Sequence, residues 1–254
     1  MAINKAKIIT ITSVKGGTGK TTTVLNLAGT FSTLDKRTLI IDLDLYSGSI
    51  AASLNINDDN NVYRLVNDIS NNVFDYMENY VTAYNDKIDV IAAPKDPRMA
   101  NKISSKYLSI ILTRASMRYD VILIDTNHVI DEINLTVMDL SDEIVYIINN
   151  DPMDLKNMKT MISIYKDMDK ENYKIILNES ADRLRDYFTK YDIKNIIKDN
   201  IDYTIPASFY IKTIDKYVLD GQILTLNKNI IATHKNAMKN FKMIASSLLK
   251  EKDK

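Results

Sequence analysis

Short runs of β-branched and other apolar residues alternate along the chain with longer stretches that are apolar on one side only. The short runs predict buried strands over residues 7–12, 38–43, 88–92, 120–125, 144–148 and 173–177. The longer stretches carry apolar residues at helical spacing and predict helices over residues 20–34, 101–117, 155–168 and 230–249. Strands that alternate with helices predict an α/β fold, in which helices cover both faces of a mostly parallel sheet.

The stretch from residue 57 to residue 86 is rich in Asn and Asp and has a weaker hydrophobic pattern. We expect short helices over residues 62–68 and 73–80, joined by Asn-rich turns. This stretch is either an insertion over the edge of the sheet or a functional surface. No repeat or proline-rich linker divides the chain, and only 6 glycines and 4 prolines are available for a hinge. We therefore expect one domain over residues 1–250, followed by a charged tail over residues 251–254.

Composition excludes several classes of chemistry. The 254 residues include no cysteine, which excludes disulfide bonds, cysteine-ligated zinc or iron–sulfur centres and a thiol nucleophile. The 33 basic and 33 acidic side chains cancel, which argues against a surface built throughout to bind nucleic acid. The first residues lack the apolar region of a signal peptide, and no run reaches the roughly 18 apolar residues of a membrane span. We therefore expect a cytoplasmic protein.

The most specific feature follows the first predicted strand, where residues 12–22 read Thr-Ser-Val-Lys-Gly-Gly-Thr-Gly-Lys-Thr-Thr. A strand, a glycine-rich turn, Gly-Lys-Thr and a helix in this order are typical of a phosphate-binding loop. The glycines allow consecutive N–H groups to converge on one anion, and the helix N-terminus adds its dipole. We expect Lys20 to reach the β- and γ-phosphates of ATP, Thr21 to ligate Mg²⁺ and Thr22 to donate to the α-phosphate. The other loop residues expected to bind the nucleotide are Gly16, Gly17, Thr18 and Gly19.

Carboxylates end two of the predicted strands. Asp42 and Asp44 lie two residues apart at the end of the second predicted strand, and Asp125 ends an apolar predicted strand later in the chain. Because the carboxyl ends of parallel strands face the ligand crevice of such a sheet, these groups should lie near the phosphate loop. Asp125 is expected to reach Mg²⁺ through water. Asp42 is interpreted as a structural residue or as a partner in the outer coordination shell.

The string from Lys15 to Thr22 resembles the deviant Walker A motif of the ParA/MinD family of P-loop ATPases. The resemblance implies a three-layer P-loop NTPase fold and a slow, partner-stimulated ATP hydrolase. It also implies that Lys15 is the signature lysine, which contacts phosphates bound in the partner subunit of an ATP-sandwich homodimer. Val14 occupies a position that varies in the family. Asp44 stands at the switch I position, where the resemblance implies that it orients the attacking water and interacts with the outer shell of Mg²⁺.

Two later segments resemble the adenine-binding elements of the family. Asn178 ends the last predicted strand, where the resemblance implies a residue that reads the base, and an amide offers both a donor and an acceptor. Pro206 lies in an Ile-Pro segment that flanks the adenine pocket in the family. The segment after Asp125 departs from the pattern, because Asn127-His128 stands where the family usually has proline or glycine in switch II. We interpret His128 as an exposed loop residue, with a switch or partner contact as the alternative.

Weaker segments resemble the CpaE/TadZ branch of the family, which is tied to pilus assembly and polar localisation. They are Val-Ile-Ala-Ala-Pro at residues 90–94, Ser-Asp-Glu-Ile-Val at residues 141–145 with residues 154–158, and Ile-Pro at residues 205–206 with residues 216–222. Members of that branch often carry an N-terminal receiver-like domain, which we do not expect here because the first strand is predicted at residue 7. The amphipathic end of the chain is interpreted as a last domain helix with its tail rather than as a membrane anchor.

These features favour an ATP-switched dimer that positions or partitions a cargo, such as a pilus or secretion machinery, through an unidentified protein partner. The alternative is a ParA-type DNA or plasmid partition ATPase. Basic residues available for DNA are Arg183, Arg185, Lys212, Lys216 and the C-terminal lysines. A metabolic enzyme that activates a small molecule with ATP, as dethiobiotin synthetase does, and a nucleotide-binding scaffold without hydrolysis are the other classes. The nitrogenase iron-protein branch is excluded because it needs cysteines, and direct membrane binding is not expected.

Overall fold

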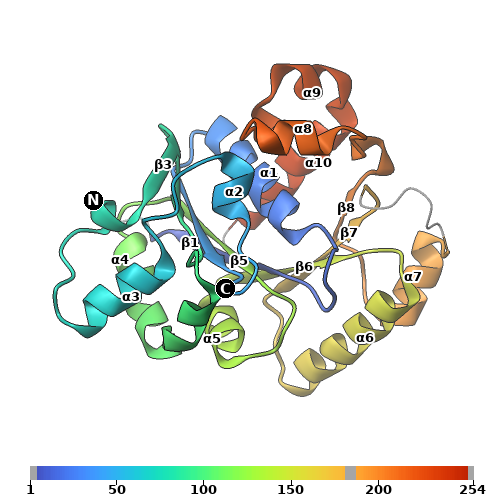
Figure 1. Cartoon of the computed structure of the whole chain (residues 1–254). Coiled ribbons are helices and arrows are strands. Elements are labelled where there is room, and N and C mark those ends of the chain that lie inside the picture. Colours follow the sequence, from blue (N-terminus) through green and yellow to red (C-terminus); the bar gives the residue numbers. More distant parts are fainter. Residues whose placement is uncertain (1–4, 181–186, 251–254) are drawn as a thin grey trace.

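The computed structural model describes residues 5–180 and 187–250, which contain an eight-stranded sheet (Figure 1). The strands lie in the order β3-β4-β2-β5-β1-β6-β7-β8. Only β3 and β4 are antiparallel, and all the other neighbouring strands in this sheet are parallel. The strands are β1 (Lys7–Thr12), β2 (Thr38–Leu43), β3 (Thr82–Asn85), β4 (Ile88–Ile91), β5 (Val121–Thr126), β6 (Glu143–Ile148), β7 (Tyr173–Asn178) and β8 (Tyr203–Ile205).

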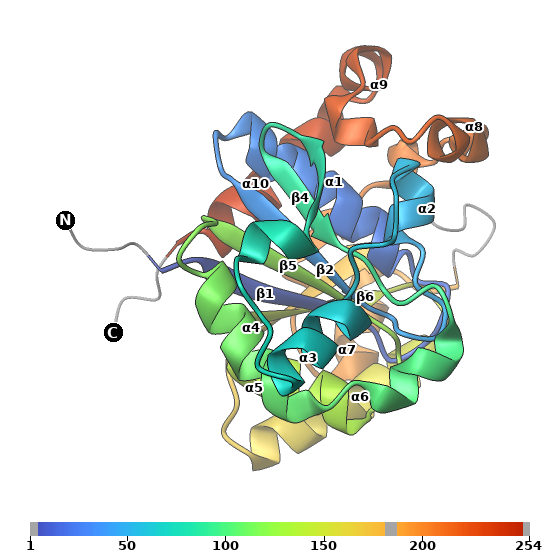
Figure 2. The same ribbon diagram turned by 60° about the vertical axis from the view of Figure 1, so that its left-hand side comes forward.

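Helices cover both faces of this sheet (Figures 1 and 2). One face carries α1 (Lys20–Thr33), α2 (Ile50–Leu54), α8 (Ile214–Leu219), α9 (Lys228–Thr233) and α10 (Lys235–Leu248). The other face carries α3 (Val62–Ser70), α4 (Leu108–Ala115), α5 (Glu132–Leu140), α6 (Pro152–Asp167) and α7 (Lys190–Ile197). One apolar core fills the space between the sheet and the first group of helices, and two further clusters lie beneath the second group. The predicted three-layer α/β fold is therefore confirmed.

All six predicted strands form, with ends that differ from the prediction by one residue at most. Their central residues are buried on both faces of the sheet, which explains the continuous apolar runs in the sequence. The sequence pattern missed the two edge strands, β3 and β8. β3 alternates half-buried and exposed residues, and β8 has only 3 residues, so neither leaves a strong hydrophobic signal.

The helix predicted over residues 101–117 is wrong in its first half. Pro97–Lys102 and Ser105–Tyr107 form 3₁₀ turns, and only α4 is an α-helix. The backbone of Ile103 is extended and interrupts the helix. Ile103 and the buried apolar residues of α4 still face the same core, so the hydrophobic spacing continues across the break.

Two further helix predictions need correction. Residues 230–249 form two helices, α9 and α10, because the backbone of His234 leaves the helical region between them. Of residues 73–80, only Met77–Tyr80 is helical, as a 3₁₀ turn. The nine-residue α5 and the short helices α2, α7 and α8 were not predicted, since each offers too few turns for a clear apolar stripe.

The parallel strands bring the predicted site residues to one edge of the sheet. β1, β2 and β5 are neighbours, and the register pairs Asp42 at the end of β2 with Asp125 at the end of β5. The loop that follows β1 begins at the same edge, so the phosphate loop and both strand-end carboxylates meet there. Within the described ranges, no helix has the length and apolar character needed to cross a membrane.

Candidate functional site

The turn between β1 and α1 has the backbone geometry of an anion-binding loop. Gly17 and Gly19 have φ angles of 77° and 92°, in the left-handed region that favours glycine. A Cβ atom on Gly19 would lie 2.5 Å from the side-chain nitrogen of Asn178, so a larger residue is excluded there by contact as well. α1 starts directly after Gly19 and has no acidic residue in its first turn, which leaves its N-terminus available to an anion.

Lys20 is the cation at the centre of this loop. Its side chain is buried, and Nζ donates a hydrogen bond to Oγ of Ser13 over 3.0 Å. Burial lowers the pKa of Lys20, while the nearby carboxylates of Asp125 and Asp44 act in the opposite direction. A phosphate group in the loop would give this desolvated ammonium an anionic partner, as predicted for the lysine of a phosphate loop.

Asp125 and Thr21 form a pair suited to a bound cation. Oγ1 of Thr21 donates to Oδ2 of Asp125 over 2.6 Å, whereas the buried Oδ1 of Asp125 has no hydrogen-bond partner among the described residues. Burial raises the pKa of Asp125 to about 7. A divalent cation would compensate the buried carboxylate, and the hydroxyl and carboxylate oxygens are the ligand types that Mg²⁺ prefers. These residues therefore fit the predicted Mg²⁺.

Protein ligands alone do not complete a metal site here. No group of three or more His, Asp or Glu side chains gathers as a metal cluster in the described part of the chain. Mg²⁺ commonly keeps several waters and takes phosphate oxygens as ligands, so one hydroxyl and one carboxylate are sufficient where a nucleotide supplies the rest.

Asp42 and Asp44 differ in their surroundings. Asp42 is buried, and its carboxylate accepts hydrogen bonds from the backbone N–H groups of Asp44 and Ile50 over 3.1 and 3.2 Å. Burial, reinforced by the neighbouring Asp125, raises the pKa of Asp42 well above its ordinary value. Asp42 therefore holds the loop after β2 in place. Asp44 is only half-buried, and within the described residues its carboxylate forms no hydrogen bond.

Lys15 is held within its own subunit in this structure. Its Nζ lies 3.0 Å from Oδ1 of Asp151, and the Lys15 side chain is 39% exposed. Asp151 is also the N-cap of α6, where it accepts from the backbone N–H groups of Met153 and Asp154. The hydrogen bond with Lys15 lowers the pKa of Asp151. Sequence reasoning missed Asp151, although an Asp-Pro pair before an amphipathic stretch is a recognisable helix start.

Asn178 contacts the phosphate loop directly. Its Nδ2 donates to the carbonyl oxygen of Thr18 over 2.8 Å, and its Oδ1 accepts from the backbone N–H and the hydroxyl of Ser180. To accept a hydrogen bond from an adenine base as well, Oδ1 of Asn178 would have to give up a bond with Ser180, so that role stays a prediction. Pro206 follows β8, whose last residue Ile205 is paired with Asn178, so the two predicted adenine-binding residues lie at neighbouring strand ends.

His128 is exposed, as predicted, and its ring faces Gly16 of the loop. Cε1 and Nδ1 of His128 lie 3.6 Å from the position that a Cβ atom on Gly16 would take. The buried Asn134, which sequence reasoning missed, holds the two residues that flank the histidine. Its Nδ2 donates to Oδ1 of Asn127 over 2.7 Å and to the carbonyl of Val129 over 2.6 Å.

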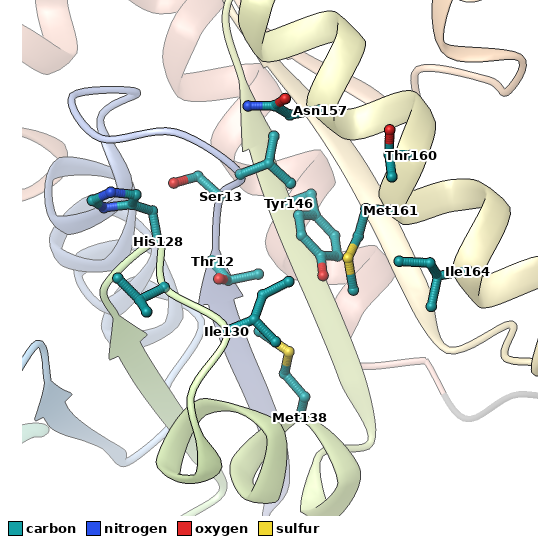
Figure 3. Close-up of a pocket in the computed structure, with 12 residues that line it drawn as sticks. Thr12, Ser13, His128, Ile130, Met138, Tyr146, Asn157, Thr160, Met161 and Ile164 are labelled. Carbon is teal, nitrogen blue, oxygen red and sulfur yellow. The ribbon is translucent and has the colours of Figure 1, made fainter.

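A cleft of about 240 Å³ opens beside the loop, between α6 and the segment that carries His128 (Figure 3). Its floor and walls are mostly apolar. It is lined by Thr12, Ser13, Val14, His128, Val129, Ile130, Met138, Tyr146, Asn157, Thr160, Met161 and Ile164. Of the residues expected to offer a basic surface, Lys212 and Lys216 are exposed, while Arg183 and Arg185 lie outside the described residues. The tail over residues 251–254 lies outside them too.

Known proteins share both sequence and fold with this chain. A family model described as an AAA domain matches residues 6–179. The tyrosine-protein kinase YwqD of Bacillus subtilis is 32% identical over 122 residues, which is 47% of this chain and 49% of the kinase. The sporulation initiation inhibitor protein Soj of the same species is 30% identical over 145 residues, 55% of this chain and 56% of Soj. The chain thus spans about half the length of these curated relatives.

Solved structures share the fold over nearly the whole chain. A ParA family ATPase from Chlorobium tepidum superposes with a TM-score of 0.80 at 20% identity, covering 94% of this chain and 98% of the other. The septum site-determining protein MinD of Pyrococcus horikoshii, complexed with Mg-ADP, superposes with a TM-score of 0.76 at 21% identity, covering 96% of each chain. The chain therefore belongs to the AAA domain family, with the P-loop fold of the ParA/MinD type.

Proposed function

We propose that the protein is an ATP-binding and ATP-hydrolysing switch that works as a cytoplasmic ATP-sandwich homodimer built from a single domain. The carrying observation is a pair of complementary buried groups, one at the start of α1 and one at the end of β5. Lys20 is a buried cation beside a left-handed glycine turn, and Asp125 is a buried carboxylate with one oxygen that has no partner among the described residues. The first group suits a phosphate, and the second suits Mg²⁺ that arrives with it. Mg·ATP satisfies both requirements at once.

Each loop residue has a defined task in this proposal. The backbone N–H groups of residues 16–19 and Lys20 hold the β- and γ-phosphates, and Thr22 contacts the α-phosphate. Thr21 would ligate Mg²⁺ and Asp125 would hold it through a water molecule, and the bound cation would neutralise charge on the phosphates. Asp44 orients the attacking water, since its carboxylate stands at the same edge and makes no hydrogen bond within the described residues.

Switching depends on Lys15. In the free subunit its ammonium is paired with Asp151, and a half-exposed ion pair of this kind is worth at most about 1 kcal/mol. Phosphates of a partner subunit offer Lys15 two or more negative charges, which favours exchange of the Asp151 contact for a contact across the dimer. ATP then stabilises the dimer, and hydrolysis removes the anion that holds the two subunits together.

Two kinds of cargo are proposed, a pilus or secretion machinery and DNA. Resemblance to the deviant Walker A motif and to the CpaE/TadZ branch supports the pilus or secretion cargo, with a protein partner. A ParA-type DNA partition ATPase is supported equally well, since one relative is named a chromosome partitioning protein. Part of the support for this alternative is the charge of residues 221–250. That stretch has no Asp or Glu, and its exposed lysines are Lys228, Lys235, Lys239, Lys242 and Lys250.

Nucleotide binding is tested by isothermal titration of the full chain with ATP and Mg²⁺. The wild type is expected to bind, and Lys20→Ala is expected to lose binding. Lys159→Ala, an exposed lysine on α6, is the matched control and should bind as the wild type does. Equal binding by Lys20→Ala and the wild type would contradict the proposed site. Hydrolysis that is abolished by Asp44→Ala separates a switch from a scaffold without turnover.

A further inference from the structure

We propose that His128 is the residue that distinguishes ATP from ADP, by donating a hydrogen bond to the γ-phosphate. This inference rests on the proposed nucleotide site and adds a residue to it. The starting observation is the place of the ring. The edge that carries Nδ1 faces Gly16, with Nδ1 and Cε1 both 3.6 Å from the position that a Cβ atom would take there. Gly16 belongs to the loop whose N–H groups would hold the terminal phosphates.

Contacts within the described ranges do not explain the position of His128. Its side chain is exposed and forms no hydrogen bond within the described residues. Figure 3 shows His128 at the edge of the cleft beside Ser13, with its ring directed away from Tyr146 and Met161. The ring therefore does not fill the apolar cleft. Either neutral tautomer of imidazole, as well as the protonated ring, keeps an N–H group that can donate to a phosphate oxygen.

The backbone around His128 is held rigidly. The side-chain oxygen of Asn127 accepts from the backbone N–H of Val129 over 2.8 Å, which closes a tight turn around the histidine. Asn134 is fully buried on α5 and donates both to Asn127 and to the carbonyl of Val129. Three hydrogen bonds thus fix the residues on either side of His128. A turn of this kind presents one side chain in a defined direction, as a group that recognises a ligand requires.

The position of His128 in the chain links it to the metal pair. It lies three residues after Asp125, at the carboxyl end of β5, the strand beside β1. His128 therefore belongs to the segment that follows the proposed Mg²⁺ residue, and its ring faces Gly16 of the loop proposed to hold the phosphates. ADP has no γ-phosphate. The difference between ATP and ADP would reach α5 through Asn134. Both hydrogen bonds that its side-chain nitrogen donates among the described residues go to the turn that carries His128.

The test compares the affinity of the full chain for two fluorescent nucleotides, mant-ATPγS and mant-ADP, in the presence of Mg²⁺. His128→Ala is expected to weaken mant-ATPγS about tenfold and to leave mant-ADP unchanged, because a charge-assisted hydrogen bond is lost only with the triphosphate. His128→Gln keeps a hydrogen-bond donor and is expected to lose less affinity for mant-ATPγS than His128→Ala does. Val129→Ala changes the exposed neighbour on the same turn and should match the wild type.

Asn127→Ala tests the positioning turn. It should weaken mant-ATPγS selectively, and in the double variant with His128→Ala it should add no further loss. If His128→Ala binds both nucleotides as the wild type does, or weakens both equally, the inference is overturned. If the wild type itself binds neither nucleotide, the proposed nucleotide site is wrong, which is a different result from an unchanged ratio in His128→Ala.

Discussion

Replacing Asp125 by Asn should make the nucleotide-free protein more stable at alkaline pH. The carboxylate of Asp125 is buried, one of its oxygens has no hydrogen-bond partner in the described part of the chain, and burial raises its pKa from 3.8 to about 7. A folded-state pKa above the unfolded value means that the native state binds the proton more tightly. Stability that the protonated group provides is therefore present below pH 3.8 and is lost as the pH rises to about 7.

The size of this effect follows from the shift. About three pKa units correspond to about 4 kcal/mol of stability lost over the whole window. Between pH 5 and pH 8, the loss spans the two units up to the folded-state pKa, or about 3 kcal/mol. Asn cannot ionise, and its oxygen can still accept from Thr21. Its amide lacks an acceptor at the place of Oδ1, a cost of about 1–3 kcal/mol that does not vary with pH.

Urea unfolding followed by circular dichroism, without nucleotide or Mg²⁺, measures the difference. The free energy of unfolding of Asp125→Asn relative to the wild type should rise by about 3 kcal/mol between pH 5 and pH 8. Asp86→Asn, an exposed carboxylate on the turn between β3 and β4, is the control and should show no such trend. A difference that stays constant with pH, or that falls as the pH rises, would refute the reasoning. The same variant should lose the stabilisation that Mg·ATP gives the wild type.

Three further predictions concern the loop and its partners. Asp151→Ala frees Lys15 and should increase ATP-dependent dimerisation in light scattering, while loss of the α6 cap lowers the free energy of unfolding by about 1 kcal/mol. Thr189→Ala removes the cap of α7 without touching Lys15, so it should cost similar stability and leave dimerisation unchanged. Gly19→Ala should abolish ATP binding in calorimetry, because φ is 92° and the new Cβ would meet a side-chain nitrogen 2.5 Å away. Asp44→Ala should still bind ATP but should no longer hydrolyse it, as measured by release of inorganic phosphate. Equal loss of binding and hydrolysis would show that Asp44 acts in binding instead.

The sequence predicted the three layers of the fold and the position of the site at the carboxyl ends of the strands, because the residues that determine them are close together in the sequence. The phosphate loop is one continuous segment, and Asp42 and Asp125 end apolar runs that are buried in the sheet. Each of these signals depends on spacing within a few residues. The predicted meeting of these groups follows from parallel pairing, which the register of Asp42 with Asp125 confirms.

Contacts between residues that are far apart in the sequence could not be predicted from the sequence. Nothing near Lys15 indicates that Asp151 is its partner, since the pairing depends on how β6 and α6 lie beside the loop. In the sequence, Asn134 is one polar residue in a short segment without a distinctive pattern. Its hydrogen bond to Asn127 is seen only in the folded structure, where the turn at Asn127 packs against it. The same applies to Asn178, whose bond to the carbonyl of Thr18 joins segments 160 residues apart.

The central claim is that ATP joins two subunits through Lys15. Light scattering of the full chain, with ATP and Mg²⁺ or with ADP and Mg²⁺, tests it most directly. The wild type should have the mass of a dimer with ATP and of a monomer with ADP, and Lys15→Ala should stay a monomer in both. Lys159→Ala should behave as the wild type does. A Lys15→Ala variant that binds ATP and dimerises as the wild type does would contradict the account.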